Sequence, residues 1–542
     1  MIARTMPTYH TLGSSRNSQS GGALLVMLVI LVIGITTAFV TSLSSTAINN
    51  KRNQTTAEAL AQAKEALIGS AVTDTSLPGS LPCPDILTQN PPSNIPNDGA
   101  ADMMSGDNCP NYLGRLPWKT LKLSDLRDGS GERLWYALSP NFRPQTSTPH
   151  KLNSDTPGTL SVSGNVTATD IVAVIFAPGR PLIGQVRSTA NENTYAHYLE
   201  SVVTSPSHYQ KLTPNDQADG AATYNDQMVF ITYGDLMPLV EQRIAREAKS
   251  CLDEYALSNP KRNYPWPGKI SNNDYTSYWN ASYILFGRIP VRPNVFTTAP
   301  NAQAFIDLLN TLQRTLNDYA ASNTTATRSA LDTAGDALDD YADIVGGPVS
   351  GGTADIGEVA GQLAEKLART PPESTVADVQ NKINQTLSGL ISDGIISHAS
   401  TSPNSMPTYW TSCPLLANVA NGYQPSDYWE SWKSLLFMQE ANNCRAFSGD
   451  CNALGGDLSV NGSGNTSGGS GTYRAAVVLA RRIVGGQTRA FSTTTSNFLE
   501  SSNVQTETDQ TPNTFLTYKT TDSNFSTVND MVLCLDGKVN CR

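Results

Sequence analysis

One stretch near the N-terminus constrains everything that follows it: the thirty-four residues between Arg16 and Lys51 carry no ionisable side chain. Residues 22–42 are nearly all apolar or small. A helix rises ~1.5 Å per residue, so this segment matches a hydrocarbon core roughly 30 Å thick. A secretory signal peptide has a shorter apolar region, of about 7–15 residues, before a site of small residues. The stretch predicts one membrane-spanning helix, which residues 43–50, lacking Pro and Gly, can extend.

Length and composition place the rest of the chain in a broad class. The chain has 542 residues, and single domains seldom exceed about 250–300 residues, so two or three domains are expected. Only 15% of the residues are charged, which favours a secreted or surface β-rich protein over a cytosolic enzyme. The net charge is −10, and no cluster of Lys and Arg alternates with aromatic residues, so no nucleic-acid partner is expected.

The cysteines indicate the compartment. All of them lie after the apolar stretch: Cys83, Cys109, Cys251, Cys413, Cys444, Cys451, Cys534 and Cys541. An even number without a Cys-x-x-Cys pair indicates disulfides rather than zinc, and hence the periplasm or the cell exterior. Many pairings are possible. Short loops favour Cys444–Cys451 and Cys534–Cys541. Cys83–Cys109 would close a loop rich in Pro, Asn and Gly, which leaves Cys251–Cys413.

Ordered motifs recur in the two halves of the chain. An apolar helical pattern at 57–68 returns at 238–252, and Gly-Arg-x-Pro at 114–117 returns at 287–290. The later matches keep the same order. Each half has an apolar run and Gly-Gln-x-Arg, then Leu-Glu-Ser after an aromatic residue, then Asn-Asp before a strand pattern, at 172–231 and at 476–535. The chain therefore contains two copies of one module, each a long helix, a loop region and a sheet.

The second copy carries an insertion. Between residues 301 and 396, apolar residues recur at helical spacing in runs separated by Gly and Pro; one run contains Phe305, Leu308, Leu312 and Leu316. This pattern predicts three or four amphipathic helices. Their apolar stripes are expected to form an ordinary packed core.

No motif in the chain predicts catalysis. There are five histidines and no His-Glu-x-x-His, Walker A or Gly-x-Ser-x-Gly motif. Paired cysteines leave no thiol nucleophile. No catalytic residue is predicted.

One acidic loop is a candidate calcium site. It contains Asp98, Asp102 and Asp107, whose carboxylates are oxygen ligands of the kind that Ca²⁺ prefers. The loop lacks the regular D-x-D-x-D-G spacing, and Asn, Asp and Gly commonly form simple turns. A solvated loop without a cofactor is the favoured interpretation, with Ca²⁺ as the alternative.

The start of the apolar stretch carries a family resemblance. The residues Gly21-Gly22-Ala23-Leu24-Leu25-Val26-Met27-Leu28 resemble the cleavage region of type IV prepilins and type II secretion pseudopilins. In that family a prepilin peptidase cuts after a Gly on the cytoplasmic side, directly before an apolar helix. The resemblance implies a leader peptide at 1–21, a cut between Gly21 and Gly22, and a transmembrane and assembly helix at 22–75. That helix would begin with Gly22, Ala23, Leu24, Leu25 and Val26.

Val26 stands where most members of the family have Glu. In pilin-like filaments that Glu is thought to pair with the N-terminal amine of the neighbouring subunit, and the K-type pseudopilin and some minor pilins also lack it. A carboxylate in hydrocarbon is costly unless it is paired, and a subunit at a filament tip has no neighbour ahead of it. Val26 therefore suggests a tip or initiation role.

The resemblance also implies a fold. It is an α+β fold: an N-terminal transmembrane helix followed by two pilin-like modules, each a long helix packed on an antiparallel sheet. The modules are expected at 56–235 and 236–542, with the helical insertion at 301–396 in the second.

The implied function is that of a large minor pilin or pseudopilin, not an enzyme. Such a subunit joins a type IV pilus-like filament, at the tip, in assembly initiation or adhesion. One alternative is a K-type pseudopilin of type II secretion. Another is a signal-anchored periplasmic or surface binding protein, or an unrecognised hydrolase. The implied partners are other minor and major pilins or pseudopilins, the prepilin peptidase and the inner-membrane assembly platform. The implied location is the bacterial inner membrane, with a single span and a periplasmic body, and later the pilus or cell surface.

Overall fold

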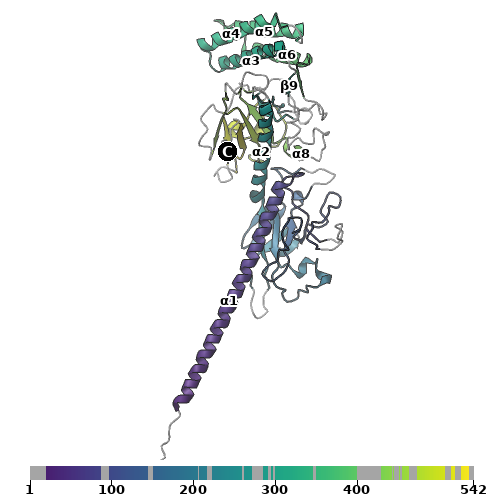
Figure 1. The fold of residues 1–542 in the computed structure, drawn as a ribbon, viewed down its shortest axis with the longest axis vertical. Helices are drawn as coiled ribbons and strands as arrows, with labels where there is room; N and C mark the ends of the chain where they lie inside the picture. The colour runs from purple at the N-terminus through teal and green to yellow at the C-terminus, as the bar shows by residue number, and fades with distance from the viewer. Residues whose placement is uncertain are drawn as a thin grey trace, which may run out of the picture.

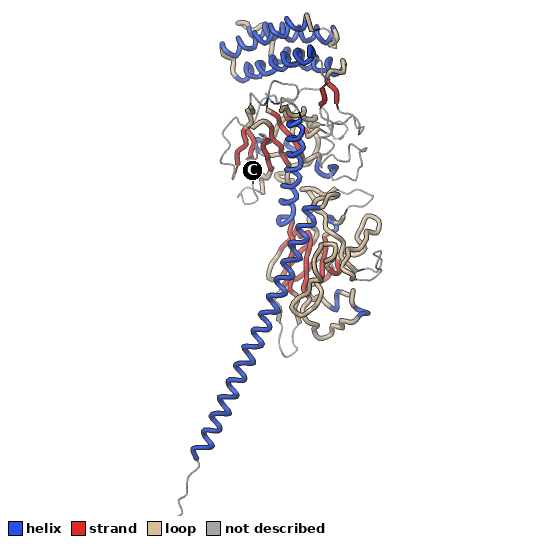
Figure 2. The backbone as a smooth tube through the Cα atoms, in the orientation of Figure 1, coloured by secondary structure: helices blue, strands red, loops and turns tan. Residues whose placement is uncertain are grey.

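The computed structural model describes residues 20–86, 97–144, 151–205, 207–215, 223–258, 262–271, 285–290, 294–296, 300–345, 349–398, 429–441, 444, 451, 455–462, 473–506, 514–518 and 526–535. The molecule is elongated. A long helix, α1 (Ser20–Thr73), projects from two stacked modules, and a helical head lies at the opposite end (Figures 1 and 2).

The first module is a sheet of seven strands against which the C-terminal part of α1 packs. The main path of the sheet runs β1-β2-β4-β3-β6-β5, and β7 also pairs with β4. The strands are β1 (Leu113–Arg115), β2 (Trp135–Leu138), β3 (Leu160–Gly164), β4 (Ala168–Ala177), β5 (Val202–Ser205), β6 (His208–Lys211) and β7 (Gln227–Thr232). Short 3₁₀ turns follow at η1 (Pro140–Phe142), η2 (Thr189–Asn191) and η3 (Tyr195–His197).

Helical spacing explains how α1 joins this sheet. Leu60, Ala63, Leu67 and Ala71 recur every three or four residues and are buried. On the sheet, β4 is buried on both faces, because its alternate side chains enter two different apolar clusters. Each fully buried Leu contributes about 1.5–3 kcal/mol through the hydrophobic effect. The C-terminal part of α1 is therefore a structural part of the body.

The second module begins where β7 ends. α2 (Tyr233–Ser258) follows β7 directly and packs on the sheet β15-β13-β11-β8. The strands are β8 (Phe286–Arg288), β11 (Leu436–Glu440), β13 (Ala475–Leu479) and β15 (Met531–Leu535), beside a separate pair, β12 (Ser459–Gly462) and β14 (Thr514–Thr517). Short elements among the described residues include α8 (Trp429–Trp432), η7 (Thr495–Asn497) and η8 (Ser501–Asn503).

The two modules share a strand order. In the first, β1-β2-β4-β7 are antiparallel neighbours, and in the second β8-β11-β13-β15 are antiparallel neighbours. The register matches as well, since Arg115 pairs with Trp135 and Arg288 pairs with Phe437. Both modules also contain one parallel pair, β3 with β6 and β12 with β14. The parallel pairs differ from the expectation of purely antiparallel sheets.

The head is the insertion in the second module. It consists of α3 (Pro300–Ala321), α4 (Thr325–Ala342), α5 (Gly351–Ala368) and α6 (Val376–Ser392), which share their own apolar core. β9 (Asn294–Phe296) and β10 (Ile396–His398) pair antiparallel where the chain enters and leaves the head. The apolar spacing predicted three or four helices, and the structure has four, of which α3 begins one residue before the expected range of 301–396.

Candidate functional site

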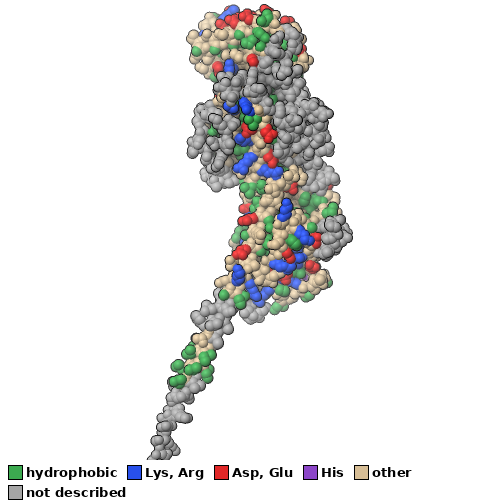
Figure 3. Space-filling view, in the orientation of Figure 1, with side chains coloured by type: hydrophobic (Ala, Val, Ile, Leu, Met, Phe, Trp, Pro, Cys, Tyr) green, Lys and Arg blue, Asp and Glu red, His purple; other side chains and the backbone are tan. Residues whose placement is uncertain are grey.

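The N-terminal half of α1 is the candidate functional site, because it projects from the body with apolar side chains exposed (Figures 1 and 3). The exposed apolar residues are 44–77% accessible and comprise Leu25, Met27, Leu28, Val29, Ile30, Leu31, Val32, Ile33 and Ile35. Consecutive residues of a helix point to different sides, so the apolar surface surrounds the helix rather than forming one stripe. A surface of this kind marks a contact with a membrane or with other proteins.

Counting only the side chains that the structure describes, no helix is both long and apolar enough to cross a membrane.

The residues predicted for processing and assembly lie at the start of this helix. Gly21, Gly22, Ala23, Leu24, Leu25 and Val26 all belong to the first two turns of α1, which begins at Ser20 and ends at Thr73 rather than spanning 22–75. Of these six, only Leu25 has a described side chain, and it is exposed. The rest of the predicted leader, residues 1–19, lies outside the described residues.

The body packs closely against α1 from residue 52 onward. A Cβ atom on Gly129 would lie 2.2 Å from the carbonyl oxygen of Arg52, so only glycine allows this approach. The Gly129 amide donates to Thr56 Oγ1 at 2.9 Å, one turn further along the helix. Lys64 bonds to Asp235 at 3.1 Å and thereby ties α1 to the first turn of α2. These contacts fix where the projecting half begins.

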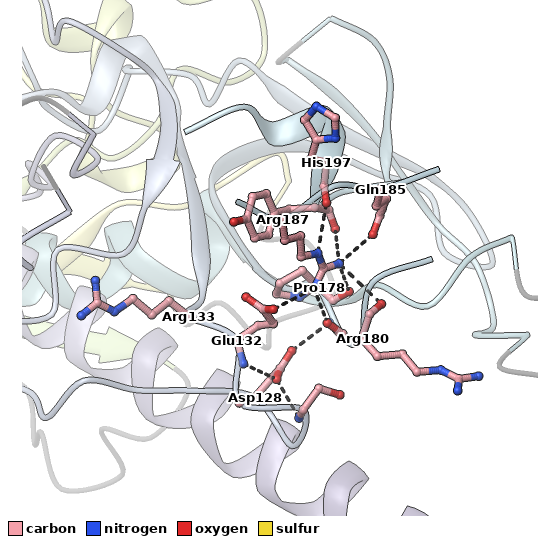
Figure 4. Close-up of polar contacts among 12 residues, drawn as sticks. Asp128, Glu132, Arg133, Pro178, Arg180, Gln185, Arg187 and His197 are labelled. Atoms are coloured by element: carbon pink, nitrogen blue, oxygen red, sulfur yellow. Dashed lines mark hydrogen bonds and ion pairs between the residues drawn. The ribbon is translucent and has the colours of Figure 1, made fainter. Parts of the chain in front are cut away.

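A network of hydrogen bonds around the buried Arg187 side chain holds the loop after β4 close to the contact between Gly129 and α1 (Figure 4). The Arg187 guanidinium donates to the Gly179 carbonyl at 2.6 Å and to Gln185 Oε1 at 2.8 Å, and it lies 3.3 Å from the Glu132 carboxylate. Asp128, next to Gly129, accepts the Gly179 amide at 2.8 Å. Burial raises the pKa of the Asp128 carboxyl, against the opposing effect of its backbone hydrogen bonds.

The second module repeats the polar contacts of this loop. Gln185 donates to Glu200 in the first module, and Gln487 donates to Glu500 at 2.6 Å in the second. The Leu182 amide donates to Gln185 at 3.0 Å, and the Val484 amide donates to Gln487 at 3.2 Å. These residues come from the Gly-Gln-x-Arg and Leu-Glu-Ser motifs, which the sequence presented as repeats without showing what they bind.

Each network ends on a buried aspartate from the Asn-Asp motif. Asp226 accepts the Ser201 amide at 2.8 Å, and Asp530 accepts the Glu500 amide at 2.9 Å. Burial, followed by repulsion from the neighbouring Glu200 or Glu500, raises the pKa of both aspartates well above the usual range. Asp226 and Asp530 therefore hold the starts of β7 and β15 in matching ways.

The structure pairs Cys83 with Cys109 and Cys444 with Cys451, as predicted. Cys251 and Cys534 are also disulfide-bonded. Their predicted partners, Cys413 and Cys541, lie outside the described residues.

The candidate calcium residues occupy a loop around Asp85. Asp98 lies 3.6 Å from Lys119, Asp102 accepts the Ile86 amide at 3.2 Å, and the carbonyl of Asp107 accepts from Arg143. Among the side chains described, no three ligand groups gather as a metal site. Calcium binding stays a prediction. Asp85 was not singled out in the sequence, although burial, then the charges of Asp102 and Asp98, raises its pKa to about 7, against a lowering hydrogen bond from Gly99.

Two further features could support other activities. His208 lies between two serine hydroxyls, with Nδ1 2.8 Å from Ser161 Oγ and Nε2 3.1 Å from Ser163 Oγ. Each ring nitrogen is therefore hydrogen-bonded to a serine hydroxyl. A cleft of about 600 Å³ opens between the modules. In its lining, the ion pair between Asp155 and Arg489 joins the two modules, whereas Glu430 and Lys433 pair with each other on the same wall.

Comparison with known proteins adds no relative: no protein-family model matches the chain, and neither a curated protein nor a solved structure matches it.

Proposed function

We propose that this chain is a pilin-like subunit, a large minor pilin or pseudopilin that joins a type IV pilus-like filament at its tip. The observation that carries the proposal is the exposed apolar N-terminal half of α1. The helix packs against the body only from Arg52 onward. Such a helix needs a cover, which would be the inner membrane before assembly and the helices of neighbouring subunits afterwards.

The residues at the start of α1 support the same proposal. Gly21 and Gly22 provide the resemblance to a prepilin cleavage site, and the apolar run follows at once. In this proposal the prepilin peptidase removes residues 1–21, and the single-pass chain keeps its body in the periplasm. The assembly platform then moves it into a filament with other minor and major subunits, for initiation or adhesion. Disulfides such as Cys83–Cys109 are consistent with that compartment.

A K-type pseudopilin of type II secretion is the second candidate. The helical head favours it, since four helices are inserted between β9 and β10 of the second module and lie at the end of the molecule opposite α1 (Figure 1). A head in that position is free to contact secreted cargo. Pilus genes or secretin-exporter genes beside the coding sequence would distinguish the two candidates.

The third hypothesis is a signal-anchored periplasmic or surface binding protein, or an unrecognised hydrolase. In it, α1 only tethers the body, and the inter-module cleft or the His208 site carries the activity.

The mature N-terminus tests the proposal. The full chain is co-expressed with a prepilin peptidase, and its intact mass is compared with that from cells carrying an inactive peptidase. We expect a chain that starts at Gly22, with or without one N-methyl group, only when the peptidase is active. An uncut chain, or one cut near Ala38 or Ala47, would contradict the proposal.

A further inference from the structure

The cleft between the modules has walls that are tied to each other. One wall comes from the segment between β2 and β3, and the other from α8, the residues after it and the loop after β13. The Asn153 side chain donates to the Ser431 carbonyl at 2.7 Å, and Arg489 contacts both carboxylate oxygens of Asp155, at 2.8 and 2.9 Å. The volume of about 600 Å³ lies in the range of small-ligand pockets, about 300–1,000 Å³. The cleft therefore has joined walls and room for a ligand.

Two cations of the first wall have no carboxylate that neutralises them. Arg143 donates through Nη1 to the Pro140 carbonyl at 3.0 Å and through Nε to the Asp107 carbonyl, so neutral groups hold its guanidinium in place. Lys151 also lines the cleft and is exposed. Within the part of the chain that the structure describes, neither cation pairs with an Asp or Glu side chain. In a chain with a net charge of −10, the first wall thus attracts anions locally.

The second wall adds cations that are already paired. Arg489 is paired with Asp155 across the cleft. Lys433 is paired with Glu430. These carboxylates would repel a ligand of high charge density, such as a phosphate chain. A polyol with one carboxylate per unit fits better, because its carboxylate pairs with the unneutralised cations and its hydroxyls donate to the carboxylate oxygens of the walls.

An aromatic ring also lines the cleft. Phe491 is 37% exposed. The Arg288 guanidinium lies 5.1 Å from the centre of its ring, and the Phe498 ring lies 5.8 Å away, so neighbours within the second module hold the ring. The exposed part of an aromatic ring offers an apolar surface against which the C–H groups of a sugar ring can pack.

We infer that the cleft between the modules binds an acidic saccharide, built of sugar units that each carry one carboxylate. Arg143 and Lys151 pair with the carboxylate of the sugar. Oxygens of Asp155 and Glu430 accept hydrogen bonds from its hydroxyls, and Phe491 packs against its ring. The site uses no residue of α1, so the inference goes beyond the proposed function and does not depend on it.

Calorimetric titration of the full chain in detergent tests the inference. The probe is trigalacturonate, and galactotriose is its neutral match. We expect trigalacturonate to bind at least about tenfold more tightly than galactotriose, which lacks the carboxylates that pair with Arg143 and Lys151. Equal affinities, or no binding of trigalacturonate, would overturn the inference. Binding of inorganic phosphate or triglutamate as tightly as trigalacturonate would also overturn it, because the cleft would then recognise charge and not a sugar.

A matched pair of lysine variants shows where the probe binds. Lys151→Gln removes an exposed, unneutralised cation of the cleft, and Lys269→Gln removes an exposed lysine of the second module that does not line it. We expect Lys151→Gln to weaken trigalacturonate binding about fivefold to tenfold and to leave galactotriose binding unchanged. Lys269→Gln should change neither. Equal losses in the two variants would show that the general charge of the protein attracts the probe, and would overturn the inference.

The aromatic contact has a test of its own. Phe491→Leu keeps an apolar side chain but removes the ring, so it should weaken the binding of trigalacturonate and galactotriose by a similar factor, about threefold to tenfold. Unchanged binding of both would show that the ring does not contact a sugar, and would overturn the assignment of a saccharide. None of these outcomes affects the mature N-terminus, so failure of the cleft inference and failure of the proposed function are distinguishable.

Discussion

The carboxyl group of Asp85 is charged only at a cost in this fold. Its side chain is buried, and it accepts the Gly99 amide at 2.6 Å while facing the charges of Asp98 and Asp102. Burial is the largest effect and raises the pKa of Asp85 to about 7. The folded protein therefore binds this proton more tightly than the unfolded chain does. For such a group, stability falls as the pH rises from the unfolded pKa through the folded pKa.

Replacing Asp85 should remove that dependence on pH. Between pH 5 and pH 8 we expect the wild-type chain to lose about 2 kcal/mol more of its free energy of unfolding than Asp85→Asn does. Denaturant unfolding of the full chain in detergent at several pH values measures the difference. Asp107→Asn, in the same loop, is the control and should keep the wild-type slope. If Asp85→Asn keeps it as well, the charge of Asp85 is not the cause.

Val26 is the residue through which the tip hypothesis can be tested. If the subunit has no neighbour ahead of it, a glutamate introduced at position 26 finds no amine to pair with and is costly in hydrocarbon. Val26→Glu should therefore reduce filament number or move the subunit away from the tip, as counted by immunogold electron microscopy. Val26→Leu is the matched control. Unchanged assembly and position in Val26→Glu would remove the support that Val26 gives to a tip role.

The packing of α1 requires one glycine, Gly129 in the loop between β1 and β2, but it does not require Gly69 within the helix itself. Gly129→Ala places a Cβ atom 2.2 Å from the Arg52 carbonyl and should cost about 1–3 kcal/mol, because the helix must move away from the body. Gly69→Ala meets nothing within 4 Å on the exposed side of α1 and should stabilise the helix by about 0.5–1 kcal/mol. Hydrogen exchange of the amides at 52–71 measures both. If both substitutions changed the stability of α1 in the same direction, Gly129 would not be the close contact that holds the helix against the body.

Several elements could be predicted from the sequence because their signal is local. Periodic apolar residues predicted α3–α6. The short loop predicted the Cys444–Cys451 disulfide, and the loop rich in Pro, Asn and Gly predicted Cys83–Cys109. The start of α2 was predicted at Pro238, but the helix begins at Tyr233. Thr232 and Asp235 exchange hydrogen bonds of 2.9 and 3.1 Å there, and this cap sets the boundary. The parallel pairs β3–β6 and β12–β14 join strands of four or five residues that lie far apart in the chain, so no local pattern predicts their pairing.

For the molecule as a whole, the contacts that join the modules could not be predicted. Asp155 and Arg489 are 334 residues apart in the chain, and no repeat or spacing connects them. The repeated Gly-Gln-x-Arg motif marked the loop after β13, but it did not show that Arg489 in this loop pairs with Asp155 of the first module. One apolar cluster also extends from α1 and β4 through α2 to β13, so the two modules share a core.

That shared core predicts how the module contact responds to mutation. Asp155 pairs with Arg489 and Asp170 pairs with Arg482 across the contact between the modules. Asp155→Asn with Asp170→Asn removes both carboxylates, and hydrogen bonds to charged groups contribute about 1.5–3 kcal/mol each. We expect the free energy of unfolding to fall by about 3 kcal/mol while the modules still unfold in one calorimetric transition. Asp340→Asn, at an exposed position in the head, should have little effect. Two separate transitions for the modules in the double variant would show that the aspartates, and not the shared core, couple them.

The continuity of α1 has a mechanical consequence. The helix runs unbroken from Ser20 to Thr73, about 80 Å at ~1.5 Å per residue. A pull on the projecting half is therefore directed along the helix axis into the body. Leu60, Ala63, Leu67 and Ala71 all resist that pull at once, in shear, instead of separating from the sheet one at a time. Because the same apolar cluster reaches β13, the load passes on to the second module, and the two modules bear the tension together.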